Sequence, residues 1–100
     1  MFATIRQYDT DDQPAELNRI VQEEFVPLVQ TLPGFISYQL IDVGDVGGRM
    51  VSISIFDTAE HAEESDKVAA TWVTSHPSFC ALSCSVECGP VVAHGYLKSS

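Results

Sequence analysis

Apolar and polar residues alternate along four stretches of the chain and recur at helical spacing along two others. Alternation with a period of two is typical of strands, and apolar residues at three- and four-residue spacing are typical of amphipathic helices. The strands are expected at residues 2–8, 35–42, 49–56 and within 83–95, and the helices between the first and second strands and between the third and fourth. Glycines in the loop at 43–48 indicate a hairpin between the second and third strands.

Local signals set the ends of the two helices. Pro14 suits the first turn of the first helix, and residues 33–34, Pro-Gly, end it. Pro27 removes a backbone hydrogen bond inside that helix, so we expect a kink or a restart there. Asp57 or Thr58 caps the second helix, and Pro77 predicts a break at the residue before it. The element order βαββαβ predicts an α+β, ferredoxin-like fold with two helices over one face of a four-stranded antiparallel sheet.

The alternation also sorts the strand residues into two faces. The apolar set is expected to face the helices: Ala3, Ile5, Ile36, Tyr38, Leu40, Val51, Ile53, Ile55, Cys84, Val86 and Cys88. The opposite face is then mixed: Thr4, Arg6, Ser37, Gln39, Ser52, Ser54, Phe56, Ser85 and Glu87. Small polar residues of this kind suit open solvent or a wet interface with a second sheet. On this face Arg6 is expected to pair with Glu87.

Composition bounds the class of protein and its partners. The chain has 100 residues, 45% hydrophobic and 19% charged, which predicts one globular domain over residues 1–100. The formal net charge of −9 argues against nucleic acid and anionic membranes, which require clustered Lys and Arg. We find no apolar run of the roughly 18–20 residues that span a bilayer and no signal peptide, so a cytoplasmic location is expected. A core this small gains from a partner subunit.

Three cysteines, Cys80, Cys84 and Cys88, have the four-residue spacing of a metal motif. On a strand, however, four residues span roughly 13 Å. Two sulfur ligands of one zinc ion each lie about 2.3 Å from the metal. The predicted strand therefore argues against a metal site, and the cysteines are interpreted as small, buried apolar side chains.

The stretches at residues 2–6, 32–38 and 51–57 resemble the antibiotic biosynthesis monooxygenase-like family of dimeric α+β barrels. The most family-like of them is Pro-Gly-x-x-x-Tyr at residues 33–38, and the resemblance covers residues 2–96. It implies a homodimer whose two sheets pack face to face with the helices outside. Some members of the family oxidise polycyclic phenols or quinols with O2 and no metal or flavin, and others degrade haem. The haem-degrading branch has an Asn on its first strand, whereas Asn18 here lies on the first helix, which disfavours that activity.

The candidate catalytic residues are His76, Trp72 and Tyr38. Trp72 and His76 are four residues apart and share one helical face if the helix persists that far. Oxygenation without a cofactor begins when an electron-rich phenol loses a proton, which His76 has the intrinsic pKa to accept. Trp72 or Tyr38 could then donate a hydrogen bond to the developing oxyanion. The alternative interpretation makes Trp72 and Tyr38 core residues and His76 a residue of the helix C-terminus.

Four further residues are candidates for contact with a small apolar or aromatic ligand: Arg6, Ile5, Ile53 and Phe25. Arg6 is either a clamp for an anionic ligand or one side of an interface salt bridge. Two functions remain open. One is a cofactor-independent monooxygenase acting on an aromatic polyketide or a quinol, and the other is a non-catalytic, ligand-binding or accessory dimer, with a cyclase or isomerase third. Polar groups in the pocket would favour the oxygenase, and purely apolar walls the binder.

Overall fold

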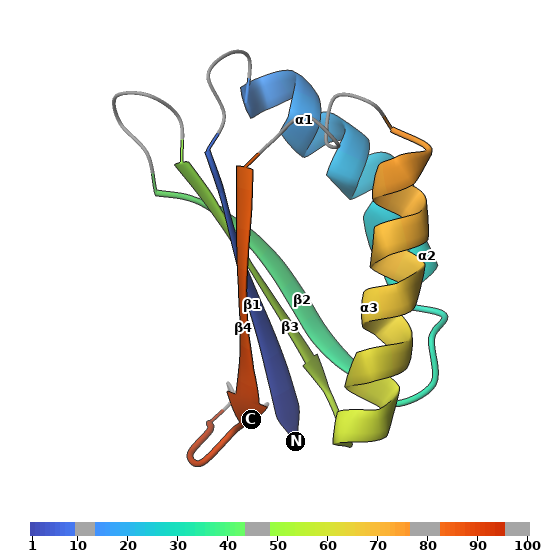
Figure 1. Cartoon of the computed structure of the whole chain (residues 1–100), viewed down its shortest axis with the longest axis vertical. Coiled ribbons are helices and arrows are strands. Elements are labelled where there is room, and N and C mark those ends of the chain that lie inside the picture. The colour runs from blue at the N-terminus through green and yellow to red at the C-terminus, as the bar shows by residue number, and fades with distance from the viewer. Residues whose placement is uncertain (10–13, 44–48, 77–82, 96–100) are drawn as a thin grey trace, which may run out of the picture.

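The computed structural model describes residues 1–9, 14–43, 49–76 and 83–95 (Figure 1). Its sheet contains β1 (Phe2–Asp9), β2 (Phe35–Asp42), β3 (Arg49–Phe56) and β4 (Ser83–Pro90) in the order β2-β3-β1-β4. All three pairs of neighbouring strands are antiparallel. The predicted ferredoxin-like fold is therefore confirmed. In Figure 1 the helices lie together on one side of this sheet, and no described element covers the other side.

The first helical segment has three parts: α1 (Pro14–Ile20), the π-helical turn η1 (Val21–Phe25) and α2 (Val26–Val29). In η1 the backbone N–H of Val26 reaches back five residues to the carbonyl of Val21. Pro27 follows at once, and its ring cannot donate a hydrogen bond and crowds the carbonyl of Glu23. The restart predicted at Pro27 is confirmed, and the wide turn is how the helix accommodates it.

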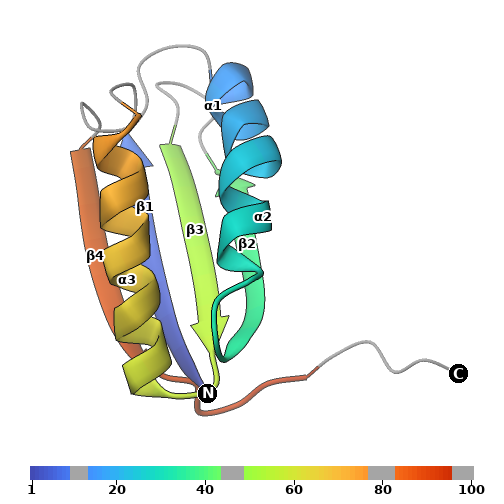
Figure 2. The ribbon, with the colours of Figure 1, turned by 90° about the vertical axis from the view of Figure 1, so that its right-hand side faces the viewer.

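The second helix, α3 (Ala59–Thr74), begins and ends where the sequence predicts. The Thr58 hydroxyl accepts a hydrogen bond from the backbone N–H of His61 at 3.2 Å, which caps the amino end. Ser75 is the C-cap, so the helix ends before Pro77. Figure 2 shows α3 and the α1–α2 segment side by side over the sheet, with α2 close to β2.

The faces predicted for β1 and β3 are wrong. Thr4, Ser52 and Ser54 are 1%, 1% and 4% exposed, and they pack beneath the helices. The register pairs Thr4 with Ser54 and Arg6 with Ser52, so these residues share one face. The apolar residues of the two strands therefore lie on the face that points away from the helices: Ala3, Ile5, Val51, Ile53 and Ile55. Alternation separates two faces but cannot say which of them the helices cover.

The predictions for the edge strands hold in part. Tyr38 and Leu40 of β2 pack against the core beneath the helices, as expected. Ile36 does not, because the pairing of β2 with β3 shifts between residues 35 and 37, and its side chain is 40% exposed. On β4, Val86 and Cys88 lie on the helix side, yet Val86 is 54% exposed and Cys88 is exposed, so the predicted burial of Cys88 is wrong. Cys80 and the side chain of Cys84 lie outside the described residues.

The core lies between the helices and the β2–β3 half of the sheet. Its buried residues are Val21, Phe25, Val29, Phe56, Ala62 and Ala69. Apolar residues packed around them include Phe2, Val26, Leu32, Phe35 and Trp72. Small side chains on α3 let this helix approach the sheet closely. The polar row of β1 and β3 therefore lies directly under the helices, where a purely structural core would be apolar.

Candidate functional site

Four aromatic side chains form a continuous row, three of them from η1, β2 and α3 and the fourth from just beyond the end of α3. Phe25 of η1 contacts Tyr38 of β2, with ring centroids 5.3 Å apart, and Trp72 of α3, at 5.1 Å. Trp72 stacks on His76, with centroids 4.0 Å apart and planes inclined by 23°. We call these four residues the aromatic row. It brings together the three predicted catalytic residues and one predicted ligand-binding residue, although their roles remain predictions.

Tyr38 stays a neutral phenol in this environment. Burial raises the pKa of its hydroxyl well above the ordinary value, and the neighbouring Tyr8 raises this pKa further. A hydrogen bond with Ser52 lowers the pKa but does not outweigh the burial. A neutral phenol keeps its proton and can donate a hydrogen bond to an oxygen that gains negative charge.

His76 is held by two hydrogen-bond acceptors. Its Nδ1 lies 2.7 Å from the carbonyl oxygen of Trp72, and its Nε2 lies 3.2 Å from a carboxylate oxygen of Glu24 on η1. Because a carbonyl and a carboxylate only accept, both ring nitrogens must donate, and only the imidazolium form has two donors. The carbonyl of Trp72 and the carboxylate of Glu24 accordingly raise the pKa of His76 above its ordinary value.

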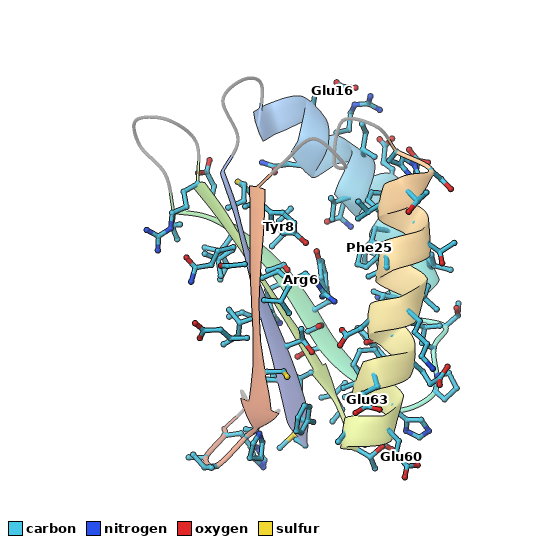
Figure 3. The ribbon with its side chains drawn as sticks, in the orientation of Figure 1. Arg6, Tyr8, Glu16, Phe25, Glu60 and Glu63 are labelled. Carbon is cyan, nitrogen blue, oxygen red and sulfur yellow. The ribbon has the colours of Figure 1, made fainter. Side chains whose placement is uncertain are left out.

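Arg6 lies under the helices, beside α3. Figure 3 shows its side chain between the sheet and the helices, and its Nη2 lies 2.7 Å from a carboxylate oxygen of Asp66 on α3. The predicted pairing with Glu87 is wrong, because Glu87 lies opposite Ile5 on the outer face. The same register corrects the positions predicted for Ile5 and Ile53. These two residues are paired with each other on the outer face and cannot line a pocket between sheet and helices.

A pocket of about 360 Å³ opens between the α1–α2 segment and the β2 edge of the sheet. Its lining residues are Asn18, Val21, Gln22, Val26, Tyr38, Gln39, Leu40, Asp42 and Met50. Tyr38 is the predicted catalytic residue that reaches it, whereas Trp72 and His76 do not line it. Four of the lining residues are apolar, and the other five carry polar groups: Asn18, Gln22, Tyr38, Gln39 and Asp42.

Sequence reasoning missed the polar lining on the first helix. Asn18 and Gln22 are four residues apart, so they follow one another on a single helical face beside the apolar positions 21 and 25. This four-residue spacing is the feature of the sequence from which the polar lining could have been predicted. Two buried polar atoms also have no hydrogen-bond partner among the described residues: Oδ1 of Asn18 and Oγ of Ser54. Unpartnered buried polar atoms are uncommon in folded proteins and mark places that call for a functional explanation.

No three His, Cys, Asp or Glu side chains in residues 1–9, 14–43, 49–76 and 83–95 lie in an arrangement that could hold a metal ion. No helix within the same residues is long and apolar enough to cross a bilayer.

No family model matches the sequence, and no curated protein matches it. Solved structures do match. A variant of SnoaB, a cofactor-independent oxygenase from Streptomyces nogalater, superimposes with a TM-score of 0.76 over 93% of this chain and 94% of that chain, at 11% identity. A monooxygenase from the gene ActVA-Orf6 of Streptomyces coelicolor, solved with nanaomycin D, gives 0.69 over 99% and 92%, at 16% identity.

The chain shares their fold. A dimeric ferredoxin-like protein from an uncultured marine organism matches equally well, with a TM-score of 0.72, 12% identity and coverage of 94% of this chain and 97% of that chain. The predicted resemblance to proteins of the antibiotic biosynthesis monooxygenase type is thus confirmed at the level of the fold. Proteins of this fold differ in function, so the reaction must be argued from the site.

Proposed function

We propose that this chain is a cofactor-independent monooxygenase that oxidises a quinol or another electron-rich phenol with O2. The observation that carries the proposal is the position of Tyr38, whose buried hydroxyl stays neutral, on the wall of a pocket of about 360 Å³. A pocket of this volume is large enough for a flat aromatic molecule. Its one buried phenol supplies the donor that a developing oxyanion needs.

The reaction requires no electron source other than the substrate. A hydroxyanthrone-type substrate loses a proton, and its anion passes one electron to O2. The substrate radical and superoxide then combine through a new carbon–oxygen bond, and a proton converts the peroxide anion to a hydroperoxide. Loss of water breaks the O–O bond and leaves a carbonyl where the substrate had a CH2 group, so that the CH2 carbon and O2 give one carbonyl and one water.

In this proposal Tyr38 donates its hydrogen bond to the substrate oxygen that becomes negative, which favours loss of the first proton. His76 and Trp72, the other two catalytic candidates, do not line the described pocket, so the proposal assigns neither of them a contact with the substrate, and the first proton passes to solvent. Both residues lie behind Phe25, which contacts Tyr38 and Trp72. Arg6 remains a candidate for binding an anionic group of the substrate, with Asp66 holding its guanidinium in place.

The proposal also includes a homodimer. The outer face of the sheet carries Ala3, Ile5, Val51, Ile53 and Ile55, and no described element of the chain covers it. Neighbouring apolar side chains on an uncovered sheet face are typical of a protein interface. A second copy that packs its own sheet on this face would bury both sets of side chains, and a dimeric ferredoxin-like neighbour supports that arrangement.

Oxygen uptake tests the proposal. Metal-free and flavin-free protein is incubated with dithranol, a dihydroxyanthrone, and O2 consumption is followed with an electrode. The wild-type protein is expected to consume O2 above background. Tyr38→Phe should lower the rate by about 100-fold, the usual cost of removing one oxyanion donor. Tyr8→Phe is the matched control, because it removes the hydroxyl of a neighbouring tyrosine that does not line the described pocket, and its rate should stay near that of the wild type.

A second function is favoured by a different observation: neither Trp72 nor His76 lines the described pocket. The pocket then suits a non-catalytic small-molecule-binding or accessory dimer. Quenching of the fluorescence of Trp72 by dithranol measures binding without turnover. Binding without O2 uptake would favour this second function and contradict the oxygenase, as would equal rates for the wild type and Tyr38→Phe.

A further inference from the structure

The contact between His76 and Glu24 joins the two helical segments. His76 follows the end of α3, and Glu24 lies in η1, next to Phe25. The distance from Nε2 to the carboxylate oxygen is 3.2 Å, and the His76 side chain is 23% exposed. A further contact between the same two segments is the packing of Phe25 on Trp72. Phe25 also touches Tyr38, so this junction adjoins the wall of the pocket.

The link between His76 and Glu24 exists only while His76 carries its second proton. Nδ1 donates to the carbonyl of Trp72, and this bond survives in neutral histidine. In that neutral tautomer Nε2 has a lone pair in place of a hydrogen. The lone pair then faces a carboxylate, and two acceptors repel rather than bind.

We propose that Glu24, His76 and Trp72 form a proton-dependent clasp between η1 and α3, which is closed while His76 is an imidazolium and opens when His76 loses its proton. Two features support the closed state. The carboxyl end of a helix favours a cation. The indole of Trp72, whose ring centroid lies 4.0 Å from that of the imidazole, also favours the cationic form of His76. The charged group that faces His76 from η1 is Glu24, and α3 contributes the carbonyl and indole of Trp72.

Opening the clasp affects Phe25, which packs against the pocket-lining residue Tyr38. Glu24 and Phe25 are consecutive residues in η1, so release of Glu24 frees the turn that packs Phe25 against Tyr38. The π-helical turn is short and wide, and such turns are frequent at functional sites. The clasp does not depend on the oxygenase proposal, because it concerns only groups that the chain itself supplies.

The fluorescence of the single tryptophan reports the clasp directly. A stacked imidazolium quenches indole emission, whereas neutral imidazole does so weakly. Emission from the wild-type protein should therefore rise in one step as the pH increases from 5 to 9, with a midpoint above 6.5. Glu24→Gln should lower the midpoint by about half a pH unit, the effect of losing one partly exposed ion pair. Glu23→Gln is the matched control, because Glu23 pairs with Arg19, and its midpoint should not move.

Hydrogen exchange separates a clasp from a merely adjacent ion pair. In Glu24→Gln, the amide oxygen can accept from protonated His76, and the amide N–H can donate to neutral His76. The link should then persist in both states of the histidine. Protection of the η1 amides, corrected for intrinsic exchange, should fall several-fold across the midpoint in the wild type and stay level in Glu24→Gln.

Three results would overturn the proposal. They are a pH-independent emission in the wild type, equal midpoints for the wild type and Glu24→Gln, and η1 protection that is level across the wild-type midpoint. His76→Gln should abolish the emission step. Because Glu24→Gln is isosteric and changes a partly exposed residue, the test survives even if His76→Gln fails to fold.

Discussion

Gly34 is required at its position by the backbone conformation and by the lack of space for a side chain. It adopts a φ of +77°, and a Cβ added there would collide with side-chain atoms of Asp57 and His61. Its carbonyl also accepts from the backbone N–H of Asp57 at 2.9 Å, which ties the start of β2 to the end of β3. The Pro-Gly turn predicted from sequence is thus a close approach between two segments that only glycine permits.

Replacing Gly34 by alanine should therefore destabilise the protein. We expect the free energy of unfolding to fall by about 1–2 kcal/mol, since the left-handed conformation is unfavourable for alanine and the side chains of Asp57 and His61 have to move away from the added Cβ. Urea unfolding followed by circular dichroism measures this change. Gly89→Ala is the matched control, because nothing lies within 4 Å of the added Cβ there. Equal stabilities for the two variants would show that Gly34 is not constrained.

At individual positions, the sequence predicted which residues belong to the candidate site better than it predicted their interaction partners. The grouping of Tyr38, Trp72 and His76 follows from helical spacing and from strand alternation on β2, and the structure brings them into one row. The partner of Arg6 could not be obtained in this way. Asp66 is 60 residues away along the chain, and its contact depends on which face of β1 lies under α3.

At the scale of elements, Pro27 showed where the first helix is interrupted but not which structure the interruption takes. Pro27 predicts a break because it lacks an N–H, and the helix does restart there. A proline at this position is compatible with a kink, a loop or a wide turn, and the helix forms the π-helical turn η1. That choice depends on packing, because η1 directs Val21 and Phe25 into the core.

The start of α3 should carry part of the acid sensitivity of the protein. The hydrogen bond with His61 holds the pKa of Asp57 below its ordinary value of 3.8. A carboxyl whose pKa is lower in the folded state stabilises the fold above the unfolded pKa, and this contribution disappears as the pH falls through the folded pKa. The stability of the wild type should thus decline below about pH 4, and more steeply than that of Asp57→Asn.

Thermal unfolding between pH 2.5 and 6 measures this slope. Glu60→Gln is a suitable control, since it removes a carboxylate from the first turn of α3 that does not pair with His61, and it should keep the steep slope of the wild type. If Asp57→Asn and the wild type lose stability in parallel over this range, Asp57 does not contribute through its pair with His61.

For the whole molecule, the order of the elements and the antiparallel hairpin followed from the sequence, but the side of the sheet that the helices cover did not. Both faces of β1 and β3 contain candidates for burial: isoleucines on one, small hydroxyl residues on the other. The expectation that apolar residues meet the helices assumes a single core. Here the helices cover the hydroxyl residues, and the isoleucines form a separate apolar face.

In the function proposed above, this division of the sheet leaves the helix side for the ligand and the opposite face for a partner subunit. Light scattering of the wild type and of Ile53→Glu tests it most directly. We predict that the wild type has twice the 10.9 kDa mass of one chain at micromolar concentration. Ile53→Glu, which places a charge at the centre of the apolar face, should have the mass of a single chain and still bind dithranol. A wild type with the mass of one chain, or an Ile53→Glu variant that remains a dimer, would contradict the account.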